Sequence, residues 1–251
     1  MNGSIRPFVR FYDRIYGDKD YSRDIAVFSE LTGLNQLRNP KVLEIGAGTG
    51  NHTTLISKCV DRLVSVEIDP DFVQVLQAKV QDRRLANVTV APVQLDQIPD
   101  RDFDSACALF HVLNYVDRDE MAQFVAALAS KMKPDAWFLA DLWNCEAVML
   151  DPPRQEKRTK LIGETSILQE INPVFNRDAL AVSLDYHISI EAPDESVRFR
   201  ELLELKLWGR EMLTKIFSEC GFDNISFHAY ADTGVPPSDA SFRQWLRARK
   251  S

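Results

Sequence analysis

Short apolar runs alternate with helical segments through the first 140 residues. The runs are four to seven residues long and aliphatic, as expected for strands that are buried on both faces. Between them, apolar residues recur at helical spacing, for example at Phe72, Leu76 and Val80. The predicted strands are 41–45, 63–66, 88–91, 104–110 and 137–140. This alternation predicts a parallel sheet with helices on both faces.

The pattern changes to a period of two in the second half of the chain. Every second residue is apolar over 180–190, and a weaker alternation covers 166–171. The alternation continues beyond 196 at Val197, Phe199, Leu203, Leu205 and Leu207. This periodicity predicts a meander of about three antiparallel strands. Residues 151–160 precede them and are charged and proline-containing, so we interpret them as a connector.

Both ends of the chain are predicted to contain helices. Residues 5–38 look mostly helical, with aromatic side chains at short intervals. After the alternating region, 211–220 reads as a helix that ends at Gly221, and 222–230 reads as strand. Residues 242–249 are predicted to form a final short helix, with its arginines on a solvated face.

Three glycines follow the first predicted strand. Gly46, Gly48 and Gly50 stand between that strand and a plausible helix at 51–56. Glycine permits positive φ and close approach to a ligand, and a helix N-terminus offers free N–H groups. The GxGxG spacing differs from the GxGxxG of dinucleotide folds. By itself the run is compatible with either a ligand-binding turn or a purely structural one.

Acidic residues follow the second and third predicted strands. Glu67 lies at the carboxyl end of strand two, about 20 residues after the glycines, where a carboxylate can accept both ribose hydroxyls. Asp96 follows strand three and is placed either to bind an adenine amine or to form a turn. Phe110 and His111 end strand four, at the edge that faces the ligand crevice of such sheets.

Charge and composition narrow the possible functions. The 251 residues carry a net charge of −7, which argues against a polyanion as the main partner. The four histidines show no metal-ligand spacing, so no metal site is predicted. No apolar run is long enough to span a membrane, and the first residues lack the core of a signal peptide. We therefore expect a cytoplasmic protein without a membrane or nucleic-acid partner.

The order of these motifs resembles class I S-adenosylmethionine (SAM)-dependent methyltransferases over roughly residues 5–230. The motifs are LEIGAGTG at 43–50, VEIDP at 66–70, LDQIP at 95–99, FDSACALFHVLNY at 103–115, FLADLW at 138–143 and LTKIFSECGF at 213–222. FYDRIYGDKDY at 11–21 and the meander are similar to small-molecule members, particularly those that dimethylate amino groups of nucleotide-linked deoxysugars.

The resemblance implies a Rossmann-like fold with a mostly parallel seven-stranded sheet, helices on both faces and an inserted antiparallel meander. It implies a SAM-binding domain of residues 1–160 and 209–251, with 161–208 covering the acceptor site. The implied SAM-binding residues are Tyr12, Tyr21, Glu44, Gly46, Ala47, Gly48, Gly50, Glu67, Ile68, Asp96 and Phe110. Packing of the aromatics as a plain helical cap is the alternative for the tyrosines.

His111 and Tyr16 are the candidate catalytic residues, because an amine acceptor must lose a proton that an imidazole or a phenol could take. His111 could equally bond a neighbouring loop and only shape the pocket. The predicted function is methyl transfer from SAM to a small polar metabolite, an amine such as an amino sugar, by a monomer or homodimer. The alternatives are small-molecule O-methylation and a SAM-binding module without turnover.

Overall fold

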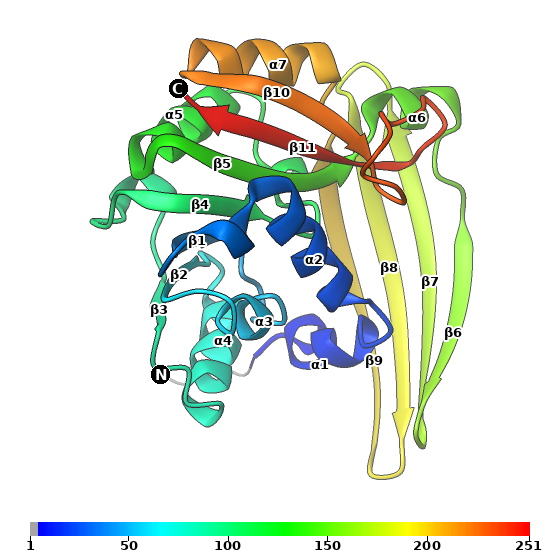
Figure 1. Ribbon diagram of the computed structural model, residues 1–251. Helices are drawn as coiled ribbons and strands as arrows, with labels where there is room; N and C mark the ends of the chain where they lie inside the picture. Colours follow the sequence, from blue (N-terminus) through cyan, green and yellow to red (C-terminus); the bar gives the residue numbers. More distant parts are fainter. Residues whose placement is uncertain (1–4) are drawn as a thin grey trace.

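The computed structural model describes residues 5–251, which form two β-sheets with helices packed around them (Figure 1). The main sheet has seven strands in the order β10-β11-β5-β4-β1-β2-β3. These are β1 (Lys41–Ile45), β2 (Arg62–Val66), β3 (Val88–Ala91), β4 (Phe103–Ala108), β5 (Met132–Trp143), β10 (Phe222–Ala229) and β11 (Arg243–Lys250). β1 to β5 pair in parallel, and β11 runs antiparallel to both its neighbours. The predicted mostly parallel sheet is confirmed.

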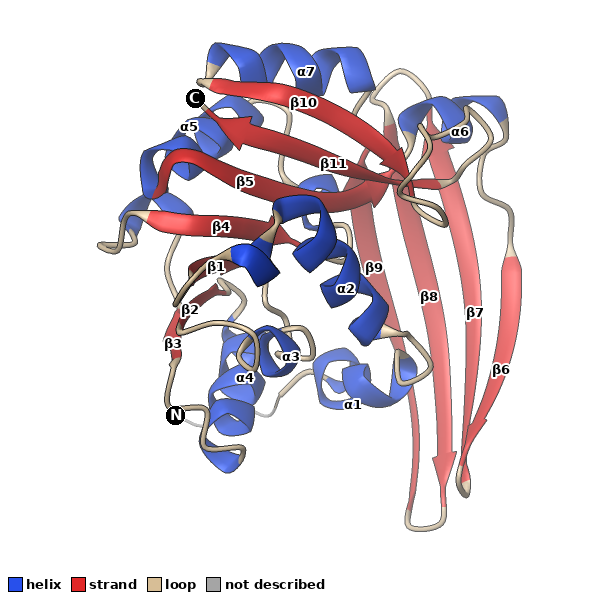
Figure 2. Ribbon diagram, in the orientation of Figure 1, coloured by secondary structure: helices blue, strands red, loops and turns tan. Residues whose placement is uncertain are grey.

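Helices cover both faces of this sheet, as a parallel sheet requires (Figure 2). α5 (Met121–Lys131) and α7 (Arg210–Glu219) pack on one face, and α2 (Tyr21–Thr32) and α3 (Thr53–Ile56) pack on the other. Successive strand residues point to opposite faces, so Leu43 joins the α5–α7 core and Val42 the α2–α3 core. α4 (Pro70–Asp82) follows β2 and begins where the Asp69 side chain accepts from the Asp71 and Phe72 N–H groups.

The second sheet is antiparallel and stands beside the main sheet (Figure 1). Its strands are β6 (Glu156–Ile162), β7 (Thr165–Asn176), β8 (Ala181–Ala192) and β9 (Glu195–Lys206), in that order. α6 (Cys145–Leu150) packs on part of its inner face. α1 (Pro7–Ile15) packs on another part, where Phe8, Phe11 and Ile15 meet Ile167, Ile188 and Ile190. The period of two in the sequence thus reflects one face buried against helices.

The prediction that residues 151–160 form a connector is wrong in its second half. β6 begins at Glu156 and pairs antiparallel with β7, so the meander has four strands. β6 is the outer strand of its sheet and is mostly exposed, which explains why it carries charged residues instead of an apolar alternation. Charges on an edge strand also oppose pairing with other chains.

The predicted helix at 242–249 is also wrong, because these residues form β11. Leu, Ala, Arg and Lys favour helix locally, but here tertiary packing overrides that preference. Trp245 is buried on the α2 face, and Leu246 on the α5–α7 face. The arginines are not on a solvated helix face: Arg247 lies over the Trp137 ring, and Arg249 bonds Asp223.

Asn114 joins the two sheets. It lies in η3 (Val112–Tyr115), the 3₁₀ turn after β4, and is fully buried. Its Nδ2 donates to the Lys206 carbonyl at the end of β9 at 2.7 Å, and its Oδ1 accepts from the Trp143 N–H at the end of β5 at 2.9 Å. One amide side chain therefore satisfies two backbone groups from different sheets.

We expect Asn114→Ala to lower the free energy of unfolding by about 1–3 kcal/mol, because it leaves a half-buried carbonyl and a half-buried N–H without their partner. Urea denaturation measures the loss. Asn35→Ala, at an exposed position before β1, is the control and should change little. An equal effect of both substitutions would contradict this role for Asn114.

Candidate functional site

A cavity of about 1380 Å³ lies between the carboxyl ends of the parallel strands, α1 and the inner face of the second sheet. Parallel strands end at a common edge, so the loops after β1, β2, β3 and β4 meet there. Eleven of the thirteen predicted site residues line this cavity. They are Tyr12, Tyr16, Tyr21, Gly46, Ala47, Gly48, Glu67, Ile68, Asp96, Phe110 and His111.

The glycine turn after β1 forms one wall. Gly46, Gly48 and Gly50 have φ values of +70°, +56° and +84°, which glycine adopts without steric cost. A Cβ at Gly46 would lie 2.5 Å from Val112 Cγ2, and one at Gly50 would lie 2.6 Å from Leu76 Cδ1. The turn is therefore fixed by conformation at Gly48, and by conformation and close packing at the other two positions.

Glu67 binds the backbone of this turn. Its Oε2 accepts from the Gly48 N–H at 2.7 Å, and its Oε1 accepts from the N–H groups of Ile68 and Asp69 at 2.8 and 3.0 Å. A carboxylate has about four lone-pair sites, so capacity remains for a further donor. Because Glu67 also lines the cavity, it can hold the turn and contact a ligand at the same time.

Glu44 and Gly50 do not line the cavity. Glu44 is buried in β1 and accepts from the hydroxyls of Thr53 and Ser65 at 2.6 and 2.7 Å. Burial raises the pKa of Glu44, and these hydroxyl donors oppose that effect. The placement of Glu44 favours a supporting role, in which it connects β1 to β2 and to α3 beneath the turn.

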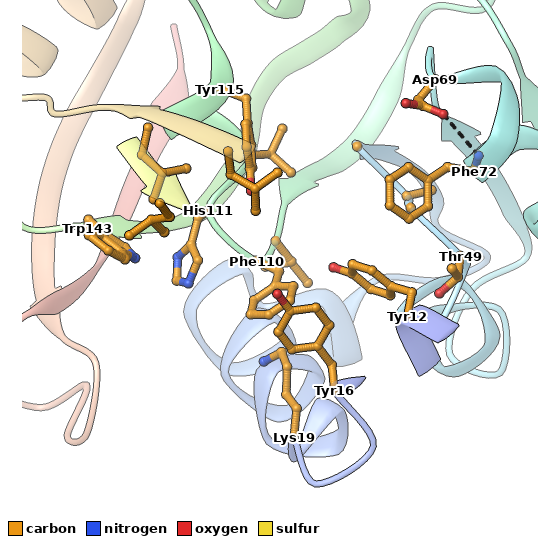
Figure 3. Close-up of a pocket in the computed structure, with 18 of the residues that line it drawn as sticks. Tyr12, Tyr16, Lys19, Thr49, Asp69, Phe72, Phe110, His111, Tyr115 and Trp143 are labelled. Atoms are coloured by element: carbon orange, nitrogen blue, oxygen red, sulfur yellow. Dashed lines mark hydrogen bonds between the residues drawn. The ribbon is translucent and has the colours of Figure 1, made fainter. Parts of the chain in front are cut away.

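Aromatic side chains from α1 and from the loop after β4 meet in the middle of the cavity (Figure 3). The centre of the Tyr12 ring lies 4.7 Å from that of Tyr16 and 5.2 Å from that of Phe72 at the start of α4. The centres of the Tyr16 and Phe110 rings are 5.1 Å apart. Burial raises the pKa of Tyr12 and of Tyr16 well above 10. Both phenols therefore stay protonated at neutral pH, which favours His111 over Tyr16 as a proton acceptor.

Two polar anchors hold α1 against this cavity. Asp13 accepts from Thr49 Oγ1 at 2.6 Å and from Lys79 Nζ at 2.7 Å, so it connects α1 to the glycine turn and to α4. Arg6, just before α1, pairs with Asp71 at 3.0 Å and with Glu201 of β9 at 3.2 Å. The helix is thus fastened to both walls of the site.

A second polar cluster surrounds the buried Asp24 of α2. Asp24 pairs with Lys19, with His52 Nε2 at 2.9 Å and with the Tyr230 hydroxyl at 3.0 Å. Burial alone would raise the pKa of Asp24, but His52 and Lys19 hold it below its ordinary value. Lys19 also lies 5.0 Å from the centre of the Phe110 ring, so a positive charge stands at this end of the cavity.

His111 lies between Phe110 and Trp143 (Figure 3). Its Nδ1 atom is 3.0 Å from Asp141 Oδ2, in a contact too bent for an ideal hydrogen bond. Burial lowers the pKa of His111 below 6.5, and the Asp141 carboxylate only partly opposes this effect. The imidazole is therefore neutral at pH 7 and able to accept a proton.

Asp96 and Ile68 stand at the cavity rim. Asp96 is exposed in η2 (Leu95–Gln97), and Lys131 of α5 donates to its carbonyl at 3.1 Å, which fixes the loop. Ile68 is 58% exposed although it is a large apolar side chain. Such a residue next to Glu67 offers an apolar surface to a flat ring.

Sequence reasoning missed several cavity residues. Lys19 lies within the quoted motif at 11–21 and His52 lies just after the glycine turn, but their contacts with Asp24 depend on how α2 packs. Gln169 occupies an inward position of an alternating strand, so a polar residue in that row was a usable signal. Arg243 gave no signal, because it was assigned to a helix. Within residues 5–251, no group of three or more potential ligands is arranged to hold a metal ion.

One family of known proteins matches part of the chain that lines the cavity. A family described as "Methyltransferase domain" matches residues 42–135. This range contains β2 to β4 and all of β1 except Lys41, together with the glycine turn, Glu67, Asp96 and His111. Residues 42–135 therefore resemble a methyltransferase domain. The rest of the chain, which includes α1, α2 and the second sheet, lies outside the matched range.

Solved structures show that the fold extends over the whole chain. A SAM-dependent methyltransferase from Clostridium acetobutylicum has a TM-score of 0.81 at 18% identity, covering 97% of this chain and 98% of that one. An amino pentose methyltransferase from Micromonospora echinaspora has a TM-score of 0.75 at 13% identity, with both chains covered completely. A sugar N-methyltransferase from Streptoalloteichus has a TM-score of 0.76 at 16% identity, covering 100% of this chain and 95% of that one. The resemblance to SAM-dependent methyltransferases is confirmed.

Two curated relatives match shorter stretches of this chain. A ribosomal RNA small subunit methyltransferase A from Mycoplasma mycoides is 29% identical over 82 residues, 32% of this chain and 31% of that one. A tRNA (guanine-N(7)-)-methyltransferase from Dechloromonas aromatica is 33% identical over 113 residues, which are 40% of this chain and 46% of that one. The chain therefore spans about a third to a half of the length of these relatives. Among residues 5–251, no helix has the length and apolar character needed to cross a membrane.

Replacement of Gly46 should cost more stability than replacement of Gly48. In Gly48→Ala the new Cβ meets no atom within 4 Å, so the only cost is the strain of the left-handed conformation, about 1–2 kcal/mol. Gly46→Ala has the same strain plus contact with Val112, about 1–3 kcal/mol more. Denaturation of both variants, and of Gly46→Ala combined with Val112→Ala, should show coupling between positions 46 and 112. Equal losses without coupling would contradict the packing argument.

Proposed function

We propose that this protein is a SAM-dependent methyltransferase that acts on a small amine, such as an amino sugar. The observation that carries this proposal is the single cavity that has the Glu67 glycine turn on one wall and His111 on another. Methyl transfer needs the acceptor aligned beside the methyl donor and water kept out, which one shared cavity supplies.

The residues of the first wall fit SAM. Glu67 retains acceptor capacity for the ribose hydroxyls, Ile68 offers an apolar face to the adenine ring, and Asp96 can accept from its amine. The rings of Tyr12 and Phe72 would close over the bound molecule, and the Lys19 charge suits a carboxylate. SAM, when bound, supplies a methyl group on a positively charged sulfur.

The second sheet supplies the acceptor side, where residues 161–208 would cover the substrate. Its inner face is largely apolar, but Gln169 interrupts the row between Ile167 and Ile171. Gln169 is only 3% exposed and lines the cavity. An amide at this position can both donate and accept hydrogen bonds, so it favours a substrate with hydroxyl groups.

An amine acceptor also suits the protonation states in the cavity. The acceptor nitrogen must lose a proton on transfer, and the neutral imidazole of His111 can take it. A hydroxyl acceptor is a weaker nucleophile and would need the same base more strongly. O-methylation of a similar metabolite is therefore the alternative that shares this geometry, and a SAM-binding module without turnover is the other.

RNA is the second candidate acceptor, because both curated relatives are named as RNA methyltransferases. Those alignments span less than half of this chain. The net charge of −7 opposes binding to a polyanion, which draws its affinity from clustered lysines and arginines. These features favour a small acceptor.

Methyl-labelled SAM tests the proposal against three acceptor sets. Nucleotide-linked and free amino sugars form the first, the same sugars with hydroxyl in place of the amine form the second, and tRNA and ribosomal RNA transcripts form the third. We expect label only in the first set. Label in the second would establish O-methylation, and label in RNA would overturn the small-acceptor proposal. SAM binding without any transfer would favour the non-catalytic module.

Glu67→Ala should weaken SAM binding by about 1–3 kcal/mol, a factor of roughly 5 to 150, because a ribose diol loses its acceptor. Titration calorimetry measures the affinity for SAM. Thermal unfolding in the absence of SAM measures the separate loss of protein stability from the missing hydrogen bond at the glycine turn. Asp82→Ala, at an exposed position that ends α4, is the matched control. Unchanged SAM affinity in Glu67→Ala would overturn the assignment.

His111→Ala should lower turnover by about 10²-fold while leaving SAM affinity nearly intact. Burial lowers the pKa of His111, so in the wild type the imidazole loses its capacity to accept only as pH falls below 6.5. The acidic limb of the pH–rate profile should therefore lie below pH 6.5 and disappear in the variant. His187→Ala, at an exposed position of β8, is the control. Near-normal turnover in His111→Ala would show that positioning alone suffices.

A further inference from the structure

The backbone beside the acceptor site is strained at two successive residues. Phe110 and His111 have φ values of +70° and +66°, in the left-handed region that residues with a Cβ rarely adopt. Such conformations persist only where the surrounding structure over-determines them, and they concentrate at functional sites. Something must therefore hold this pair of residues in place.

Asp141 is the group that holds them. It lies near the end of β5, is fully buried and does not itself line the cavity. Its Oδ1 accepts from the Phe110 N–H, and its Oδ2 accepts from Arg243 Nη2 at 2.8 Å. The same Oδ2 lies 3.0 Å from His111 Nδ1. Although burial alone would raise the pKa of Asp141, His111 and Arg243 hold it well below its ordinary value.

We propose that Asp141 is a positioning residue that fixes the Phe110–His111 turn and keeps the proton of the neutral imidazole on Nδ1. Nε2 is then the nitrogen that accepts a proton from the acceptor, which rests on the function proposed above. A contact that is bent before substrate binds is common at catalytic sites and straightens in the complex. A carboxylate behind Nδ1 is the usual device for setting a histidine tautomer.

Arg243 balances Asp141 from the antiparallel strand β11. It lies over the Tyr230 ring at 3.7 Å, and its backbone is opposite Trp143 of β5. The charged groups that face the imidazole are Asp141 of β5, Arg243 of β11 and Lys19 of the α1–α2 loop. Asp141 raises the pKa of His111, whereas Arg243 and Lys19 lower it. Removal of Asp141 or of Arg243 should therefore change the His111 pKa in opposite directions.

Asp141→Asn exposes the tautomer directly, because an amide has one acceptor and one donor where the carboxylate had two acceptors. If its oxygen stays beside the Phe110 N–H, its NH₂ group takes the place of Oδ2, next to both Arg243 Nη2 and His111 Nδ1. The NH₂ group cannot accept from Arg243, but it donates to His111 Nδ1, which moves the ring proton to Nε2. If the amide turns over, its NH₂ group opposes the Phe110 N–H and loosens the turn. Arg243→Met keeps the carboxylate and should keep the Nδ1 tautomer.

Nitrogen-15 NMR of histidine-labelled protein without ligands tests this, with the His111 signals identified by their loss in His111→Asn. We expect an Nδ1-protonated ring in the wild type, a lower His111 pKa with an Nε2-protonated ring in Asp141→Asn, and a higher pKa with the wild-type tautomer in Arg243→Met. Asp223→Asn and Arg249→Met remove an ion pair between β10 and β11 and should leave His111 unchanged.

An Nε2-protonated ring in the wild type would overturn the proposal, whatever the variants do. If Asp141→Asn fails to fold, Arg243→Met still decides, because an unchanged or lower His111 pKa contradicts the charge balance. SAM titration of the wild type separates this proposal from the function on which it rests. Absence of SAM binding would overturn that function, whereas the NMR result would concern Asp141 alone.

Discussion

The close approach of backbone to side chains at Gly46 and Gly50 is the constraint on which the site depends. Without a Cβ at these positions, Val112 from the loop after β4 and Leu76 from α4 can pack directly on the turn after β1. Glu67 then bonds the N–H of Gly48, so the ends of β1, β2 and β4 are fixed relative to one another. The cavity is the space that remains above this joint, and α1 is fastened over it through Asp13.

The two sheets supply different chemistry to one cavity. The parallel sheet contributes backbone turns and acids, which suit a nucleoside, and these are local products of each strand and the loop that follows it. The antiparallel sheet contributes a broad apolar face with Gln169 in its middle, which suits a small polyhydroxylated acceptor. Asn114 holds the two sheets together, so the distance between the two sides is built into the fold.

The sequence predicted β1 to β4 and most of the residues that line the cavity because each signal is local: an apolar run, a glycine turn, then an acid. β6 was not predicted because an edge strand needs no apolar face. β11 was not predicted because its residues favour helix locally, and only pairing with β5, about 100 residues away, makes them a strand. Asp141 and Arg243 could not be paired in advance for the same reason. Their contact depends on the β5–β11 register, which no local pattern reports.

A crystal structure of the complex with S-adenosylhomocysteine and an amino sugar would test the central claim, that one cavity between the sheets seats both the methyl donor and a small acceptor. We predict the ribose at Glu67, the sulfur directed toward the Phe110–His111 turn, and the acceptor amine near His111 with its hydroxyls toward Gln169. Binding of the nucleoside away from the glycine turn, or of the acceptor outside the inner face of the second sheet, would contradict the account.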